Sequence, residues 1–252
     1  MSPWRPSLLW RPTHAAWGLD ARDLAWRPAQ EAAGEVRRAP HAVAWPQALA
    51  QLDPGATVAV IAANDIAVHW LQTPPASVSS LDELRLVAAA RCAHLHGGAP
   101  GDWWIAADWN ATLPFVCAAL PYSAVTPWQR KLATAGISAH WHTAWGVACG
   151  SVANTFPDDG WSALRGPTRF LLWHCRAGRV DCLGMQSMSP GTSDEDANAQ
   201  ALRQIRIEAM RDPSLSGEPP HWVNITAGGT DADDSEAIAA LGLAALLQGG
   251  AS

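Results

Sequence analysis

Apolar residues lie in short segments along most of the chain, and turn residues separate one segment from the next. Residues 15–26 read apolar, then polar, then apolar again, which predicts a β-hairpin. Residues 57–72 repeat this pattern around the polar pair Asn64-Asp65, so a second hairpin is predicted there. The chain is therefore expected to open with β-structure.

A helix is predicted after the second hairpin. Ser80 and Glu83 have the spacing of a capping box, and apolar residues follow at helical spacing until Gly97-Gly98 ends the pattern. The next segments predict strands over residues 102–110 and 112–121, a helix over 122–136, a strand over 137–142 and a helix over 143–156.

The second half of the chain begins at a connector rich in proline, glycine and aspartate, residues 157–167. Residues 168–187 predict a hairpin. A helix over 198–211, a strand over 221–230 and a terminal helix over 235–248 are predicted after it. Strands that alternate with helices, with a hairpin near the start of each half, predict an α/β fold built from two related lobes.

The charge balance argues against nucleic-acid binding. The 252 residues carry a formal net charge of −6, and Lys131 is the single lysine. A nucleic-acid-binding surface needs a basic stripe that neutralises phosphates. We therefore expect no nucleic-acid partner.

The lengths of the apolar runs and the pattern of cysteines indicate the cellular compartment in which the protein is expected. No apolar run approaches the roughly 18 residues of a membrane span, and the first 14 residues contain three prolines in place of the helical apolar segment of a signal peptide. The five cysteines are odd in number and include no C-x-x-C pair, which is typical of reduced, mostly buried thiols. We expect a cytoplasmic protein.

Tryptophan is unusually abundant, with 15 residues against one tyrosine. Most are expected in the core, and some are expected to line a groove for a partner. In the predicted strand over 102–110, Trp103 and Trp109 are six positions apart and share one face, while Trp104 points to the other. Both faces of this strand therefore carry an indole.

Five segments, taken in order, resemble the actin-like proteins of bacterial pilus and secretion platforms. They are residues 17–26, 69–91, 113–148, 223–234 and 237–247. The families are PilM, the actin-like component of type IV pilus assembly, and the cytoplasmic domain of GspL from type II secretion. The resemblance implies an actin-like (RNase H-like) α/β fold with a first lobe over 1–153, which carries a small inserted subdomain at about 71–110, and a reduced second lobe over 154–252.

The resemblance also implies a partner. In these families a groove beside the inserted subdomain receives a short peptide from the cytoplasmic N-terminus of a bitopic membrane protein. This implies that Trp103, Trp104 and Trp109 bind the partner. The alternative, that the three indoles belong only to the core, remains open.

The nucleotide site of the resembled families is altered here. Their ATP-binding members carry Asp-x-Gly-Ser/Thr where this chain has Asp20, Ala21, Arg22 and Asp23, and residues 170–179 offer no second Asp-x-Gly. Glycine allows a phosphate to approach the backbone closely, and arginine does not. Asp20, Arg22, Gly228 and Gly229 are thus expected to form a degenerate nucleotide site, and ATP with Mg²⁺ is not an expected cofactor.

Other constellations give weaker signals. The pairs His94-x-His96 and His140-x-His142 lack a third ligand at metal spacing, so no metal site is expected. His174 and Cys175 are neighbours on a predicted strand and face opposite sides, so they are not expected to act together. No residue is predicted to be catalytic.

The resemblance as a whole implies a cytoplasmic scaffold of a type IV pilus or type II secretion platform. Such a protein lies at the inner membrane through the tail of its bitopic partner, contacts the assembly ATPase and is not itself an enzyme. One alternative is an active phosphotransferase or ATPase of the sugar-kinase and actin superfamily that uses Asp20, Arg22 and Gly228-Gly229. Another is that the chain is the cytoplasmic part of a longer GspL-like protein.

Overall fold

The computed structural model describes residues 15–19, 23–26, 37–150, 157–166, 168–189, 191–215 and 217–223. The chain forms two compact units. Among the described residues, one unit contains 67–122 and those between 157 and 223, and the other contains those between 15 and 66 and those from 123 to 150. These units do not follow the predicted lobes 1–153 and 154–252, and the lobe boundary stays a prediction.

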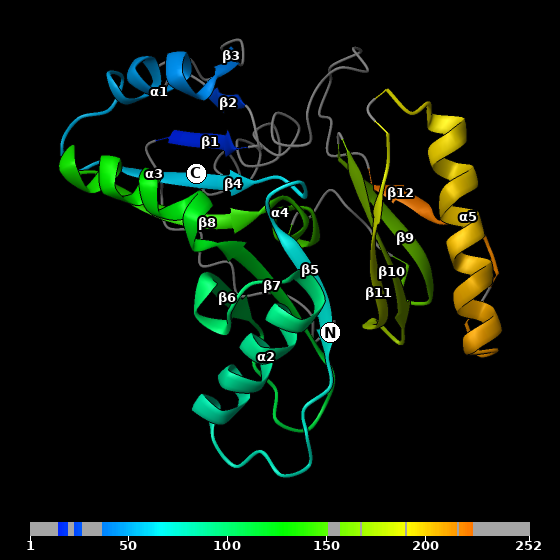
Figure 1. Cartoon of the computed structure of the whole chain (residues 1–252). Coiled ribbons are helices and arrows are strands. Elements are labelled where there is room, and N and C mark those ends of the chain that lie inside the picture. Colours follow the sequence, from blue (N-terminus) through cyan, green and yellow to red (C-terminus); the bar gives the residue numbers. More distant parts are fainter. Residues whose placement is uncertain are drawn as a thin grey trace. The chain divides into compact units, whose positions relative to one another are not determined.

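A five-stranded sheet with the order β3-β2-β1-β4-β8 forms one unit (Figure 1). Its strands are β1 (Ala15–Leu19), β2 (Asp23–Trp26), β3 (Arg37–Pro40), β4 (Thr57–Ala62) and β8 (Ser138–Thr143). Strand β1 is antiparallel to β2 and parallel to β4, and β4 is parallel to β8. The helix α4 (Ala144–Gly150) follows β8.

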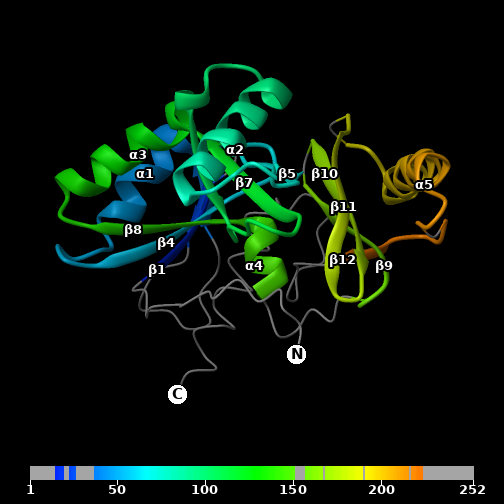
Figure 2. The same ribbon diagram turned by 90° about the horizontal axis from the view of Figure 1, so that it is seen from below.

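Helices α1 (His41–Leu49) and α3 (Tyr122–Thr134) cover the same face of this sheet (Figure 2). Apolar side chains of both helices bury themselves against alternate residues of β1 and β4, because alternate residues of a strand share one face. The principal members of this core are Trp17, Leu19, Val58, Val60, Ala44, Trp45, Ala48, Trp128 and Leu132.

The other unit contains a three-stranded antiparallel sheet with the order β5-β7-β6. Its strands are β5 (Val68–Gln72), β6 (Trp103–Ala107) and β7 (Phe115–Pro121). Helix α2 (Leu81–His96) buries Leu84, Ala88 and Cys92 against one face of the sheet. The hydroxyl oxygen of Ser80 accepts a hydrogen bond from the backbone N–H of Glu83 at 3.2 Å, which confirms the predicted cap. A short 3₁₀ helix, η1 (Pro100–Asp102), precedes β6.

The same unit contains a four-stranded sheet with the order β11-β10-β9-β12. Its strands are β9 (Gly160–Arg165), β10 (Arg169–Arg176), β11 (Arg179–Ser187) and β12 (His221–Val223). Helix α5 (Asp194–Arg211) packs on one face and buries Ala197, Ala201 and Ile205. The indole N–H of Trp222 on β12 donates to Oδ1 of Asn198 on α5 at 3.2 Å.

Two of the sheets repeat one topology. In each, three antiparallel strands are followed by a helix and by a fourth strand parallel to the first, which gives β1-β2-β3-α1-β4 and β9-β10-β11-α5-β12. The three-stranded sheet and α2 stand between β4 and β8 in the sequence. The mixed α/β class with two related halves, predicted from the sequence, is confirmed.

Several local predictions are wrong. Residues 57–72 do not form a hairpin, because β4 pairs with β1 and β8 while β5 pairs with β7 in another sheet. The connector at 157–167 contains β9, and helix α1 with β3 was not predicted. The predicted helix over 235–248 lies outside the described residues.

Candidate functional site

Strand β6 places its indoles on two faces, as predicted from strand alternation. Trp103 points toward α2, and its indole N–H donates to the carbonyl oxygen of Gly97 at 3.0 Å. Trp109 lies beyond the end of β6 and still packs against the α2 side, with its ring centroid 5.8 Å from that of Phe115. Trp104 is half-buried, and strand alternation turns it to the opposite face.

Strand β6 is also an edge strand. Within the described residues, β7 is its one strand partner, with Trp104 opposite Leu120 and Ala106 opposite Ala118. Ala106 is exposed. The outer edge of β6 therefore has backbone groups to which an extended chain can add as a further strand.

A second candidate region lies at the carboxyl ends of β1, β4 and β8. These strands are parallel and in register, so that Leu19 lies beside Ala62, and Ala62 lies beside Thr143. The backbone N–H of Ala63 donates to the carbonyl oxygen of Leu19 at 2.9 Å. Asn64, which follows, is fully buried. Ligands of open α/β sheets bind at this kind of edge.

The residues predicted for the nucleotide site cannot be placed in this region. Asp20 and Arg22 belong to the connection between β1 and β2, and Gly228 and Gly229 follow β12. All four lie outside the described residues. Their role stays a prediction.

The repeated topology makes two connections equivalent. The connection between β9 and β10 is the counterpart of the connection between β1 and β2. The backbone N–H of Gly166 donates to the carbonyl oxygen of Arg169 at 2.7 Å. The guanidinium of Arg165 donates to the carbonyl oxygen of Thr192 and pairs with Asp194. This turn contains no Asp-x-Gly.

The tip of the β10–β11 hairpin holds a charged network. Nδ1 of the buried His174 lies 2.7 Å from Oδ1 of Asp181, and Nε of Arg176 lies 2.9 Å from Oδ2 of the same carboxylate. Burial, with nearby acidic side chains, raises the pKa of Cys175 to about 11 and that of Cys182 to about 12. Both thiols are therefore protonated at neutral pH, and neither is prepared to act as a nucleophile.

The histidine pairs are dispersed. His94 and His96 are exposed at the end of α2, and burial, with His140 beside it, lowers the pKa of His142 to about 4. Among the described residues, no three histidine, cysteine or carboxylate side chains are grouped as ligands for a metal ion.

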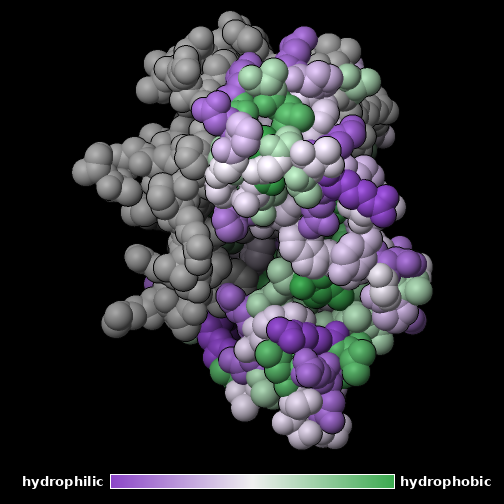
Figure 3. Space-filling view, turned by 90° about the vertical axis from the view of Figure 1, so that its left-hand side faces the viewer, coloured by the Kyte–Doolittle hydropathy of each residue, from purple (hydrophilic) through white to green (hydrophobic). Residues whose placement is uncertain are grey.

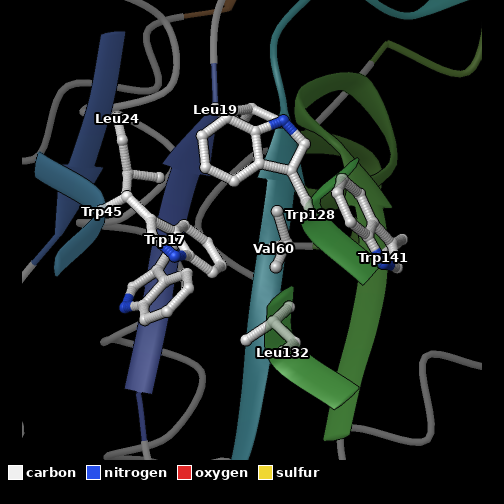
Figure 4. A pocket seen from close by; sticks show the side chains of 8 residues that line it. All are labelled: Trp17, Leu19, Leu24, Trp45, Val60, Trp128, Leu132 and Trp141. Atoms are coloured by element: carbon white, nitrogen blue, oxygen red, sulfur yellow. The ribbon is translucent and has the colours of Figure 1, made fainter. Parts of the chain in front are cut away.

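A small apolar pocket lies under α1 and α3 (Figure 4). Its lining includes four indoles, Trp17 from β1, Trp45 from α1, Trp128 from α3 and Trp141 from β8. On the face drawn in Figure 3, the coloured hydrophobic residues form small groups separated by hydrophilic ones. None of the helices in the described part of the chain combines the length and apolar character needed to cross a membrane.

Comparisons with known proteins identify the fold. No protein-family model and no curated protein matches the chain. The structure is similar to the cytoplasmic domain of EpsL, an inner-membrane component of the type II secretion system of Vibrio cholerae, over 92% of this chain and 94% of that chain, with a TM-score of 0.52 and 12% identity. It is also similar to a Bacteroides thetaiotaomicron protein of unknown function with an actin-like ATPase fold, over 88% and 84% of the two chains, with a TM-score of 0.50 and 8% identity.

A further match is a chain of a PilM–PilN type IV pilus biogenesis complex, which covers 78% of this chain and 67% of that chain with a TM-score of 0.45 and 13% identity. The matches to EpsL and to the Bacteroides protein establish an actin-like fold for this chain, as the sequence predicted.

Proposed function

We propose that this chain is a non-catalytic, actin-like scaffold of a type IV pilus or type II secretion platform. It would dock the cytoplasmic N-terminal tail of a bitopic inner-membrane protein and contact the assembly ATPase through its partners. The shared fold with the cytoplasmic domain of an inner-membrane secretion component supports this proposal. The expected location is the cytoplasmic side of the inner membrane.

The observation that carries the proposal is the edge strand β6 with an indole on each face. An extended tail can add backbone hydrogen bonds to a strand edge and can seat an apolar side chain against an indole. Trp103 packs on the α2 side of the sheet, and strand alternation turns Trp104 to the other face, so we assign Trp104 to the tail. Trp109 also packs on the α2 side, and its role is to support the end of the strand.

The test is a titration of the purified chain with a peptide that copies the N-terminal cytoplasmic segment of the single-span membrane protein encoded beside it. Trp104→Ala should weaken binding at least about tenfold, which corresponds to about 1.4 kcal/mol, and should lower the melting temperature less than Trp103→Ala does. Trp103→Ala is the matched control. It removes an indole from the α2 core, so it should lower the melting temperature more than Trp104→Ala does. Equal affinity of the wild-type chain and Trp104→Ala would remove β6 as the docking site.

An ATP-binding enzyme is the second candidate, favoured by the buried Asn64 at the carboxyl edge of the parallel strands. Arg22 in place of the turn glycine, and a β9–β10 turn without Asp-x-Gly, argue against it. We expect ATP with Mg²⁺ to bind weakly or not at all. Calorimetric titration with a dissociation constant in the low micromolar range would favour the enzyme over the scaffold.

A further inference from the structure

One face of helix α5 is directed away from the sheet on which the helix packs. Helix α5 buries Ala197, Ala201 and Ile205 against its sheet, and the residues half a turn away are turned outward. This outward face, called the α5 face below, comprises Glu195, Asp196, Ala199, Arg203, Arg206, Ile207 and Met210. In Figures 1 and 2 the sheet β11-β10-β9-β12 lies on one side of α5, and no described helix or strand of the same unit lies on the other side.

Charge is segregated along the α5 face. Glu195 and Asp196 give its first turn negative charge, while Arg203 and Arg206 give its second half positive charge, and all four residues are exposed. Asp196 accepts a hydrogen bond from the hydroxyl of Ser193, and the residue is exposed at the surface. The structure gives Glu195, Arg203 and Arg206 no ion pair within its described part.

Apolar side chains accompany the arginines. Met210 is 76% exposed and Ile207 is 39% exposed, and both lie on the α5 face. Ala199, in the middle of that face, is small enough to let a second helix approach closely. Exposed apolar groups mark interaction sites between proteins, and methionine and arginine are both enriched at such interfaces.

We propose that the α5 face binds the α5 face of a second copy of this chain, antiparallel and about a two-fold axis at the level of Ala201. The pairs Asp196 with Arg206 and Ala199 with Arg203 share this midpoint, so Asp196 of each copy meets Arg206 of the other. A two-fold interface requires this kind of self-complementary patch. Antiparallel helices also oppose their dipoles favourably.

The extent of the face sets the strength of the contact. From Asp196 to Met210 the helix rises by roughly 21 Å, so one helix per copy buries less than the roughly 800 Å² per partner of a standard interface. Self-association is therefore weak, depends on protein concentration, and weakens with salt because its charges are exposed. This inference does not depend on the proposed docking function.

The experiment is sedimentation velocity of the purified chain over a wide concentration range at about 50 mM and about 500 mM NaCl. Dimers should form at high concentration in low salt and dissociate in high salt. Arg206→Glu should raise the dissociation constant at least about tenfold, because it sets a second carboxylate against Asp196 of the other copy. Arg130→Glu on α3 makes the same charge change on another exposed surface and should leave the dimer intact.

A mixture of two charge-reversal variants tests the proposed pairing of Asp196 with Arg206 directly. Asp196→Arg alone and Arg206→Glu alone should each be monomeric, yet an equal mixture should dimerise, because both ion pairs of the mixed dimer are again attractive. Circular dichroism establishes that each variant keeps its helices. A wild-type chain that is monomeric throughout, an Arg206→Glu variant that behaves like Arg130→Glu, or a mixture that fails to associate would each overturn the proposal.

Discussion

The ammonium nitrogen of Lys131 lies 5.1 Å from the ring centroid of Trp128, and 5.3 Å from that of Trp45. The only lysine of the chain therefore sits over two of the indoles that line the apolar pocket. A cation over an aromatic face is attracted by the negative charge of the ring face.

Lys131→Met keeps much of the aliphatic stem of the side chain and removes its charge. We expect it to lower the free energy of unfolding by about 0.5 to 1 kcal/mol, the size of an exposed cation–π contact. Urea unfolding measures this change. Lys131→Arg should retain most of the stability, and Arg130→Gln, which removes a neighbouring exposed charge, should cost less than Lys131→Met.

Trp103→Ala should destabilise the three-stranded sheet. The substitution removes an indole that packs on the α2 core and leaves the carbonyl oxygen of Gly97 without its hydrogen bond. Because the indole is half-buried, we expect a loss of about 2 kcal/mol, less than for a fully buried tryptophan. Thermal unfolding of Trp103→Ala and Trp104→Ala, compared side by side, checks the order.

Ala177 has a φ of +50° at the tip of the β10–β11 hairpin, followed by Gly178 at +71°. Alanine is strained in this left-handed region, whereas asparagine tolerates it. Ala177→Asn should therefore raise the stability by about 0.5 kcal/mol. The same change at the exposed Ala106 on β6 serves as the control and should not stabilise the chain. A loss of stability at position 177 would contradict the strain argument.

His142 makes stability depend on pH. Burial, and after it His140, lowers the pKa of folded His142 from 6.5 to about 4. Between these values the unfolded chain binds more protons than the folded chain, so stability falls as the pH drops from about 6.5 toward 4 and is retained above that window. Removal of the titrating group should weaken this dependence.

The measurement is the urea midpoint of His142→Asn and of the wild-type chain at pH 7 and pH 5. The variant should lose less stability between the two pH values. His94→Asn, which changes an exposed histidine, should follow the wild-type pH dependence.

Cys92 and Cys117 should react slowly with a small alkylating reagent. Both thiols are fully buried, and burial raises the pKa of each, that of Cys92 to about 11. Reaction needs an exposed thiolate, so mass spectrometry should find these two sites modified only after urea is added. Rapid labelling of either site in the native chain would contradict the packing of α2 on β7.

Local patterns in the sequence determined where most strands and helices form. Ser80, Glu83 and Gly97 bracket α2 at the residues predicted, because capping and a left-handed glycine act within one turn of the helix. Strand alternation likewise assigned Trp103 and Trp104 to opposite faces. Helix α5 begins before the predicted 198–211, because Asp194, Glu195 and Asp196 form its first turn behind the cap of Ser193.

Strand partners were decided only by the tertiary structure. Residues 57–72 read as a hairpin, but β4 is flanked by β1 and β8, and β5 joins a different sheet with β7. Alternation identifies which side chains are buried but not which strand lies alongside. Parallel partners such as β1, β4 and β8 are far apart in the sequence, and their pairing depends on burying both faces of β4, with Val58, Ile61 and Ala62 fully enclosed.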